Sequence, residues 1–240
     1  MHKNRYQKLT APGFSLLEMA IVLAIVGLLL AGLLPTIAAQ MDQQHRNDTR
    51  KLMEEAKEAL FGFSMSNGYL PCPASQVGGL EDRNDTTLAC NRRMGFLPWA
   101  TLGVNQVDGW GHLLTYSASP DYTTASQVFA IIGSTRDISI RNLADATISK
   151  QSDVPAVLIS HGANGLFATL ENGNIINSTA PLSFENVSRQ ATNANGVGTA
   201  IYSADPTART AANDEEFDDL VVWISPNVLI NRMVAAGRLP

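Results

Sequence analysis

The sequence is poor in the residues on which several common functions depend. It has two cysteines and four histidines in 240 residues, and its 17 Lys and Arg are outnumbered by 22 Asp and Glu, giving a net charge of −5. Duplex nucleic acid requires a clustered basic face, so this balance argues against a nucleic-acid partner. Neither His112 nor His161 has a second His or a Cys at metal-ligand spacing, and no Gly-x-Ser-x-Gly motif accompanies them. We expect no metal, no cofactor and no enzymatic activity.

The two cysteines, Cys72 and Cys90, leave two interpretations open. An even count fits one disulfide if the chain is exported to an oxidising compartment, and two free thiols if it is cytosolic. A disulfide closing a loop of this length stabilises a fold by roughly 3 kcal/mol in the chain-entropy model.

Charge is almost missing from residues 14–39, which read FSLLEMAIVLAIVGLLLAGLLPTIAA with Glu18 as the one charged residue. A helix of about 20 apolar residues crosses a bilayer, so this run is long enough. Residues 1–13 are basic and carry no acid, which by the positive-inside rule places the N-terminus in the cytoplasm. We expect a single-pass membrane protein, with lipid around this helix, the N-terminus in the cytoplasm and the head on the opposite side of the membrane.

Glu18 does not fit an ordinary membrane helix. An unpaired carboxylate inside a bilayer costs about 3 kcal/mol, so a charge at this place predicts a function and a partner. A cut between Gly13 and Phe14 would create an α-amino group four residues before Glu18. Two neighbouring helices, shifted along their axes, could then pair the amine of one with the carboxylate of the other.

The hexapeptide from Gly13 to Glu18, GFSLLE, resembles the processing motif of type IV prepilins and type II secretion pseudopilins. The resemblance implies that a membrane aspartyl protease, the prepilin peptidase, cuts after Gly13 and methylates the new terminus at Phe14. It also implies that Glu18 pairs with the terminal amine of a neighbouring subunit during assembly. Gly27 and Pro35 fall where many members carry a helix-softening glycine and a kink proline.

This resemblance implies a structural subunit of a bacterial inner membrane, with a periplasmic head, and it names the partners. They are the prepilin peptidase, other pilin or pseudopilin subunits and the inner-membrane assembly machinery. The product is a type IV pilus or a type II secretion pseudopilus, periplasmic or extracellular, in which the large head suggests a minor component. Two alternatives are a Sec signal peptide cut near Ala39 and an uncut signal anchor on a periplasmic enzyme or binding protein. A signal peptide normally has an apolar core of about 7–15 residues and no glutamate.

Helical character continues beyond the apolar run, through residues 40–66. Small or apolar residues recur there in alternating steps of four and three, which predicts an amphipathic helix resting on an apolar surface. These residues are His45, Thr49, Leu52, Ala56, Ala59 and Phe63. Asn67-Gly68 then ends the helix. The predicted division is a cleaved leader (1–13), a membrane and assembly helix (14–39), its amphipathic continuation (40–66) and a globular extracytoplasmic head (67–240).

The head alternates short apolar runs with turn residues, which predicts strands. The predicted strands are Leu113 to Tyr116, Val128 to Ile132, Val154 to Ser160, Leu166 to Leu170 and Leu220 to Ile224. Residues 162–165 and 171–174 predict hairpin turns, because Asn and Gly tolerate positive φ, and residues 186–213 predict a long surface loop. Ser225, Pro226 and Gly237 predict a short C-terminal helix. The expected fold is α+β and pilin-like, with the long N-terminal helix packed on a mostly antiparallel sheet.

Three groups in the head carry candidate chemistry, and we favour a structural interpretation of each. The segment 108–112, Asp-Gly-Trp-Gly-His, resembles a turn found in many major pseudopilin heads, where Trp110 would cover one end of the core. His161 lies before a turn, which is typical of a solvated loop histidine. The acidic run 214–219 lacks the EF-hand spacing, which favours a solvated loop over a calcium site.

Overall fold

A computed structural model gives the fold of two compact units, residues 1–43 and 44–240, which are described separately. The predicted strand Val128 to Ile132, the leader residues 1–12 and Phe14 lie outside the described residues. The structure describes residue 13 and residues 15–124, 138–142, 149–152, 154–176, 199–203, 208–209 and 216–239.

The first element is one long helix, α1 (Leu16–Asn67), close to the predicted limits of 14 and 66. Its backbone continues through both Gly27 and Pro35. Among the described side chains, no helical stretch reaches the length and hydropathy that a membrane span requires. The side chains of residues 32–36, inside the predicted span 14–39, lie outside the described ones.

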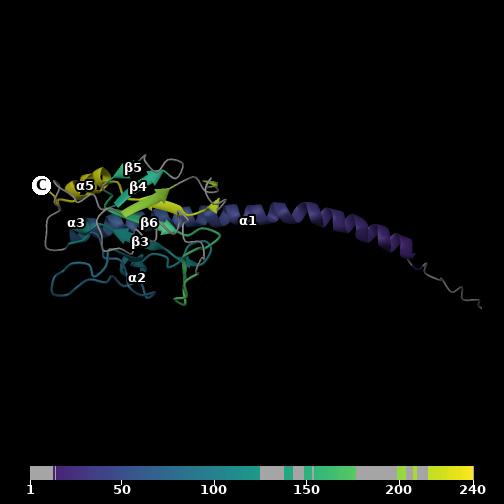
Figure 1. Cartoon of the computed structure of the whole chain (residues 1–240), viewed down its shortest axis with the longest axis horizontal. Helices are drawn as coiled ribbons and strands as arrows, with labels where there is room; N and C mark the ends of the chain where they lie inside the picture. The colour runs from purple at the N-terminus through teal and green to yellow at the C-terminus, as the bar shows by residue number, and fades with distance from the viewer. Residues whose placement is uncertain are drawn as a thin grey trace, which may run out of the picture. The chain divides into compact units, whose positions relative to one another are not determined.

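The head is built on a four-stranded antiparallel sheet in the order β1-β3-β6-β11. Figure 1 labels its two central strands, β3 and β6. Its register places Tyr116 opposite Leu158, and Leu158 opposite Val222. The strands are β1 (Met94–Phe96), β3 (Thr115–Ala118), β6 (Ala156–Ser160) and β11 (Leu220–Trp223). The predicted strands 154–160 and 220–224 are therefore confirmed to within two residues.

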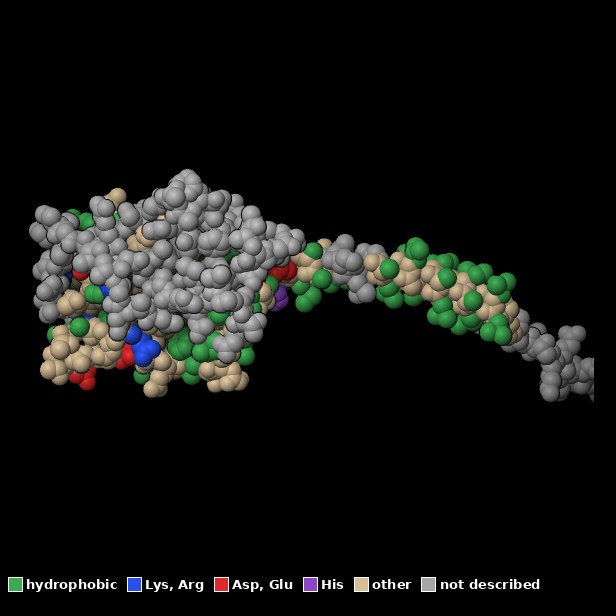
Figure 2. Space-filling model, viewed as in Figure 1, with side chains coloured by type: hydrophobic (Ala, Val, Ile, Leu, Met, Phe, Trp, Pro, Cys, Tyr) green, Lys and Arg blue, Asp and Glu red, His purple; other side chains and the backbone are tan. Residues whose placement is uncertain are grey.

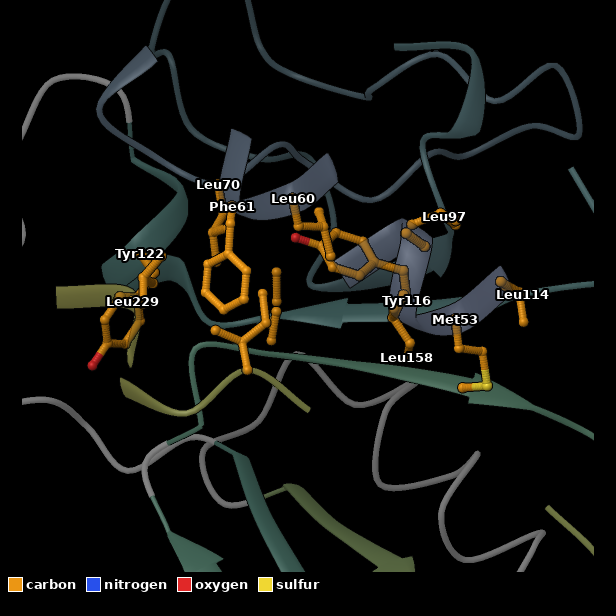
Figure 3. Close-up of a cluster of buried hydrophobic side chains, with 14 of the residues drawn as sticks. Met53, Leu60, Phe61, Leu70, Leu97, Leu114, Tyr116, Tyr122, Leu158 and Leu229 are labelled. Carbon is orange, nitrogen blue, oxygen red and sulfur yellow. The ribbon is translucent and has the colours of Figure 1, made fainter. Parts of the chain in front are cut away.

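The second half of α1 packs on one face of this sheet, which confirms the predicted α+β arrangement of a helix on an antiparallel sheet. Figure 3 shows Met53, Leu60 and Phe61 of α1 beside Tyr116 and Leu158 of the sheet, and all five are buried. At about 2 kcal/mol for each large apolar side chain removed from water, these side chains together contribute roughly 10 kcal/mol to the favourable free energy of folding.

The predicted phase of the buried stripe on α1 is partly wrong. Thr49 and Ala56 are buried as expected, but Met53 and Leu60 are fully buried where Leu52 and Ala59 were predicted. Both sets repeat in steps of three and four, and the buried face of a helix on a sheet is wide enough to include both. Small residues lie at the centre of this face too, since Thr49 and Ser64 are as fully buried as Met53 and Leu60.

A second sheet covers the opposite face, in the order β5-β4-β8. Side chains alternate between faces along β6, so Leu158 contacts the helix side while Val157 and Ile159 join Ile138 and Ile140 in a second apolar cluster. Its strands are β4 (Ile138–Asn142), β5 (Ser149–Ser152) and β8 (Thr199–Ser203). The β4–β8 pair is parallel, an exception to the antiparallel rule of the head.

Several predictions for the head need correction. The expected loop 186–213 contains β8 and β9 (Ala208–Arg209), and β9 pairs with β10 (Glu216–Phe217). The expected strand 113–116 divides into β2 (His112–Leu113) and β3, which join different sheets. The turn 162–165 is not a hairpin, because β7 (Thr169–Leu170) pairs with β2 rather than with β6. Two short helices, α2 (Trp99–Leu102) and α3 (Pro120–Thr123), were not predicted.

The chain ends in helix α5 (Pro226–Ala235), which lies against the second half of α1. Arg232 donates two hydrogen bonds to the Glu58 carboxylate, at 2.6 and 2.9 Å, and its guanidinium carbon lies 4.2 Å from the centre of the Phe61 ring. These hydrogen bonds hold the pKa of Glu58 below its ordinary value. Beyond α5, Arg238 donates to the backbone carbonyls of Met65 and Ser66, in the last turn of α1.

We predict that Arg238→Gln lowers the free energy of unfolding by about 1 kcal/mol, because the last carbonyls of a helix have no partners within the helix and favour a nearby cation. Urea unfolding of residues 44–240, the second compact unit, measures the change. Arg50→Gln, at an exposed position on the same helix, is the matched control and should change it by less than about 0.5 kcal/mol. Equal effects of the two substitutions would contradict the capping role of Arg238.

Candidate assembly segment and a buried polar cluster

The predicted processing site lies just before the first helical residue. Gly13 is exposed and outside α1, and Phe14 lies outside the described residues. Ser15 precedes the helix, and its side-chain oxygen accepts a hydrogen bond from the Glu18 N–H at 3.2 Å. The spacing Ser15-x-x-Glu18 matches a capping box, a signal in the sequence that predicts a helix beginning at Leu16.

Glu18 lies in the first turn of α1, and it is exposed. The unsatisfied N–H groups of a helix N-terminus give it a partial positive charge, which stabilises a carboxylate there by roughly 0.3–1 kcal/mol. The structure thus places Glu18 where its charge is favoured within its own helix. It tests no pairing with another subunit.

The described residues Leu16 to Ala31 form an apolar surface on all sides of the helix, interrupted by Glu18. Every one of them is exposed, and Leu16 and Leu28 reach 92% and 77%. Figure 2 shows these hydrophobic side chains along the N-terminal part of α1. A helix that is hydrophobic all round is stable when lipid or other protein covers it.

Gly27 and Pro35 lie within this helix, but their predicted role as kink positions stays a prediction. A Cβ atom added at Gly27 would have no described atom within 4 Å. Packing against the described residues therefore does not require glycine at this position. The side chain of Pro35 lies outside the described ones.

A cluster of polar side chains is buried where β2, β3 and β6 meet the segment before β11. We call it the buried polar cluster, and its members are Asp108, His112, Thr115, Ser160, His161 and Asp219. The Asp108 carboxylate is its centre, since it accepts the N–H groups of Trp110 and His112 at 2.9 Å and the Ser160 hydroxyl at 2.6 Å. The predicted structural role of the 108–112 turn agrees with these bonds, which fix the turn into β2.

His161 connects the other half of the cluster. Its Nε2 lies 3.0 Å from the Thr115 hydroxyl, and its Nδ1 lies 3.7 Å from the Asp219 carboxylate. A hydroxyl, an imidazole and a carboxylate in this order occur in nucleophilic enzymes. Here all three are buried, so the Thr115 hydroxyl is not accessible to a substrate in this structure. The prediction that His161 is a solvated loop histidine is wrong, because it is only 4% exposed.

The acidic run 214–219 also differs from its prediction. Asp214 and Glu215 lie outside the described residues, but Asp218 and Asp219 are buried rather than solvated. Asp218 accepts the Asn164 N–H at 2.8 Å. A Cβ atom at Gly162 would lie 2.5 Å from the Asp218 carboxylate carbon, so the turn 162–165 requires glycine at this contact. The carboxylate of Asp218 therefore holds a turn of its own chain.

Cys72 and Cys90 form a disulfide, and the half-buried Arg83 supports the loop between them. Arg83 donates hydrogen bonds to the carbonyls of Leu88 and Thr123, both at 2.7 Å. It also pairs with Glu81 at 3.2 Å, and Glu81 accepts the Cys72 N–H at 3.0 Å. The loop is thus held by an ion pair and backbone bonds as well as by the covalent link.

Comparisons of the chain with protein-family models, with curated proteins and with solved structures find no match. The motif from Gly13 to Glu18 and the contacts described above are therefore the basis for a functional interpretation.

We predict that Asp108→Ala lowers the free energy of unfolding by about 3 kcal/mol, because it leaves three donors, two of them buried, without their acceptor. Asp108→Asn is the matched variant, since its amide keeps an oxygen for the two N–H groups of Trp110 and His112, and it should cost about 1 kcal/mol. Urea unfolding followed by circular dichroism measures both. A loss as large for Asn as for Ala would show that the charge matters more than the hydrogen bonds.

Proposed function

We propose that this protein is a pilin-like structural subunit, cut between Gly13 and Phe14 by a prepilin peptidase and assembled through α1 into a filament. The observation that carries the proposal is the apolar, exposed surface of residues 16–31, with the single charge of Glu18 one turn into the helix. Such a surface requires a cover. The prepilin-like motif from Gly13 to Glu18, at the start of this surface, indicates that lipid contacts the surface first and other subunits contact it after assembly.

The proposed mechanism is assembly by packing of apolar helices. Before assembly, residues 14–39 lie in the inner membrane with the basic leader in the cytoplasm and the head in the periplasm. After the cut, the Glu18 carboxylate of one subunit neutralises the Phe14 amine of a neighbour within the bundle. A pair of this kind selects register more than it adds stability, because both charges lose their water.

The head's chemistry is compatible with this location. The Cys72–Cys90 disulfide is typical of a protein that folds in an oxidising compartment such as the periplasm. We propose that the filament is a type IV pilus or a type II secretion pseudopilus, that the chain is a minor subunit of it, and that the head has no catalysis of its own.

A second candidate is a membrane-anchored periplasmic enzyme or binding protein. The arrangement of Thr115, His161 and Asp219, a hydroxyl, an imidazole and a carboxylate in order, is the observation that favours it. The burial of all three side chains opposes it. It also leaves no role for Glu18, since an anchor works better without a charge.

We predict that the mature protein begins at Phe14 with a methylated amine. Mass spectrometry of protein purified from its own host measures this end directly. Gly13→Leu should leave the leader attached, because the prepilin motif that this segment resembles is cut after a glycine. Gly27→Ala, a small change further along the same helix, should leave processing unchanged. A mature chain that begins at Gln40, as a Sec signal peptide cut after Ala39 would produce, contradicts the proposal.

We predict that Glu18→Ala is processed normally but enters filaments roughly tenfold less or worse, because the neighbour's amine is left buried without its partner. Immunoblots of sheared filament fractions, normalised to processed subunit in the membrane, measure incorporation. Glu18→Gln should fail as well, since the charge is what pairs, whereas Glu171→Ala in an exposed turn should not. Normal incorporation of Glu18→Gln would refute the ion pair.

A further inference from the structure

Helix α1 begins at a hydrogen-bonded cap. The Glu18 N–H donates to the Ser15 side-chain oxygen at 3.2 Å and to the Ser15 carbonyl at 3.1 Å, and the Met19 N–H donates to the same carbonyl at 3.2 Å. A serine that precedes the helix and bonds the third N–H in this way is an N-cap.

The cap matters most where water is scarce. The first four N–H groups of a helix have no partner within it, and in water the solvent satisfies them. In a bilayer or in a bundle of apolar helices an unsatisfied N–H is far more costly. The proposed function brings this end of α1 into such an environment, where the Glu18 N–H is shared between the side-chain oxygen and the carbonyl of Ser15.

The cap also sets where the helix begins. With Ser15 as the cap, Leu16 is the first helical residue and Glu18 the third, while Gly13 stays outside the helix. After the proposed cut, Phe14 would be the one residue before the cap. The amine and the Glu18 carboxylate are then separated by a single turn whose start is fixed.

We propose that Ser15 is a positioning residue for assembly. Its side-chain oxygen holds the first turn of α1 closed and thereby fixes the height of the Glu18 carboxylate relative to the mature N-terminus. Pairing with a neighbouring subunit depends on this height, because the two groups must meet between helices that are shifted along their axes. The inference rests on the proposed function and adds a second residue to its assembly site.

Ser15→Thr and Ser15→Val test the proposal, since the two side chains have nearly the same shape and only threonine can cap. In the full-length chain in its host, Thr should assemble like the original protein. Val should be cut after Gly13 but incorporated about fivefold less, the factor expected from the loss of one cap. Incorporation is measured as sheared filament per processed subunit, so a change in cleavage does not affect it.

A second measurement follows the cap itself. Hydrogen exchange of the Glu18 amide is recorded by NMR on the full chain in detergent micelles. It should be about fivefold faster in the Ser15→Val variant than in the Ser15→Thr variant. Equal exchange, or equal incorporation of the two variants, would overturn the role of Ser15. A failure of the original chain to be cut after Gly13 would instead overturn the proposed function, so the two failures are distinguishable.

Discussion

The head of this protein depends on the burial of one face of α1 against a four-stranded sheet. Met53, Ala56, Leu60 and Phe61 supply the helix side of that core, and the sheet supplies Tyr116 and Leu158. Because a single strand such as β6 sends alternate side chains to opposite faces, the other face of the same sheet packs against Ile138 and Ile140 of β4. Helix α5 and Arg238 then secure the end of α1, through the Glu58 carboxylate and the last carbonyls of the helix. The second half of α1 is therefore a structural part of the head.

The two ends of α1 follow different physical rules. From Leu16 to Ala31 the helix is apolar on every side, whereas beyond residue 44 it has one buried face and one charged face. The first pattern suits lipid or a bundle of like helices, and the second suits a folded head in water. The two ends of the helix are also capped differently. The Ser15 side chain accepts an N–H of the first turn from within the same segment, while Arg238 donates to a carbonyl of the last turn from the far end of the chain.

The polar interior of the head serves its turns. Asp108 binds the N–H groups that form the turn into β2, and Asp218 binds the turn 162–165, so two buried carboxylates replace backbone partners that irregular segments lack. Burial favours such bonds only when the acceptor is fully used, and Asp108 meets that condition with three donors. His161 and Thr115 belong to the same interior, which accounts for a hydroxyl, an imidazole and a carboxylate in sequence without requiring catalysis.

The sequence by itself determined the long helix and two strands of the central sheet, β6 and β11, because hydrophobic period, glycine and proline act over a few residues. It also contained the cap at Ser15, in the Ser-x-x-Glu spacing. Only the tertiary structure decided which residues of α1 face the core. The face is wide enough for both Leu52 and Met53, and the position of the sheet determines which of the two is more deeply buried. It likewise decided that His161, Asp218 and Asp219 are buried. From the sequence alone, a polar residue next to a turn is expected to be solvated. The partners that bury these residues lie far along the chain: Thr115 bonds His161, and Asn164 bonds Asp218.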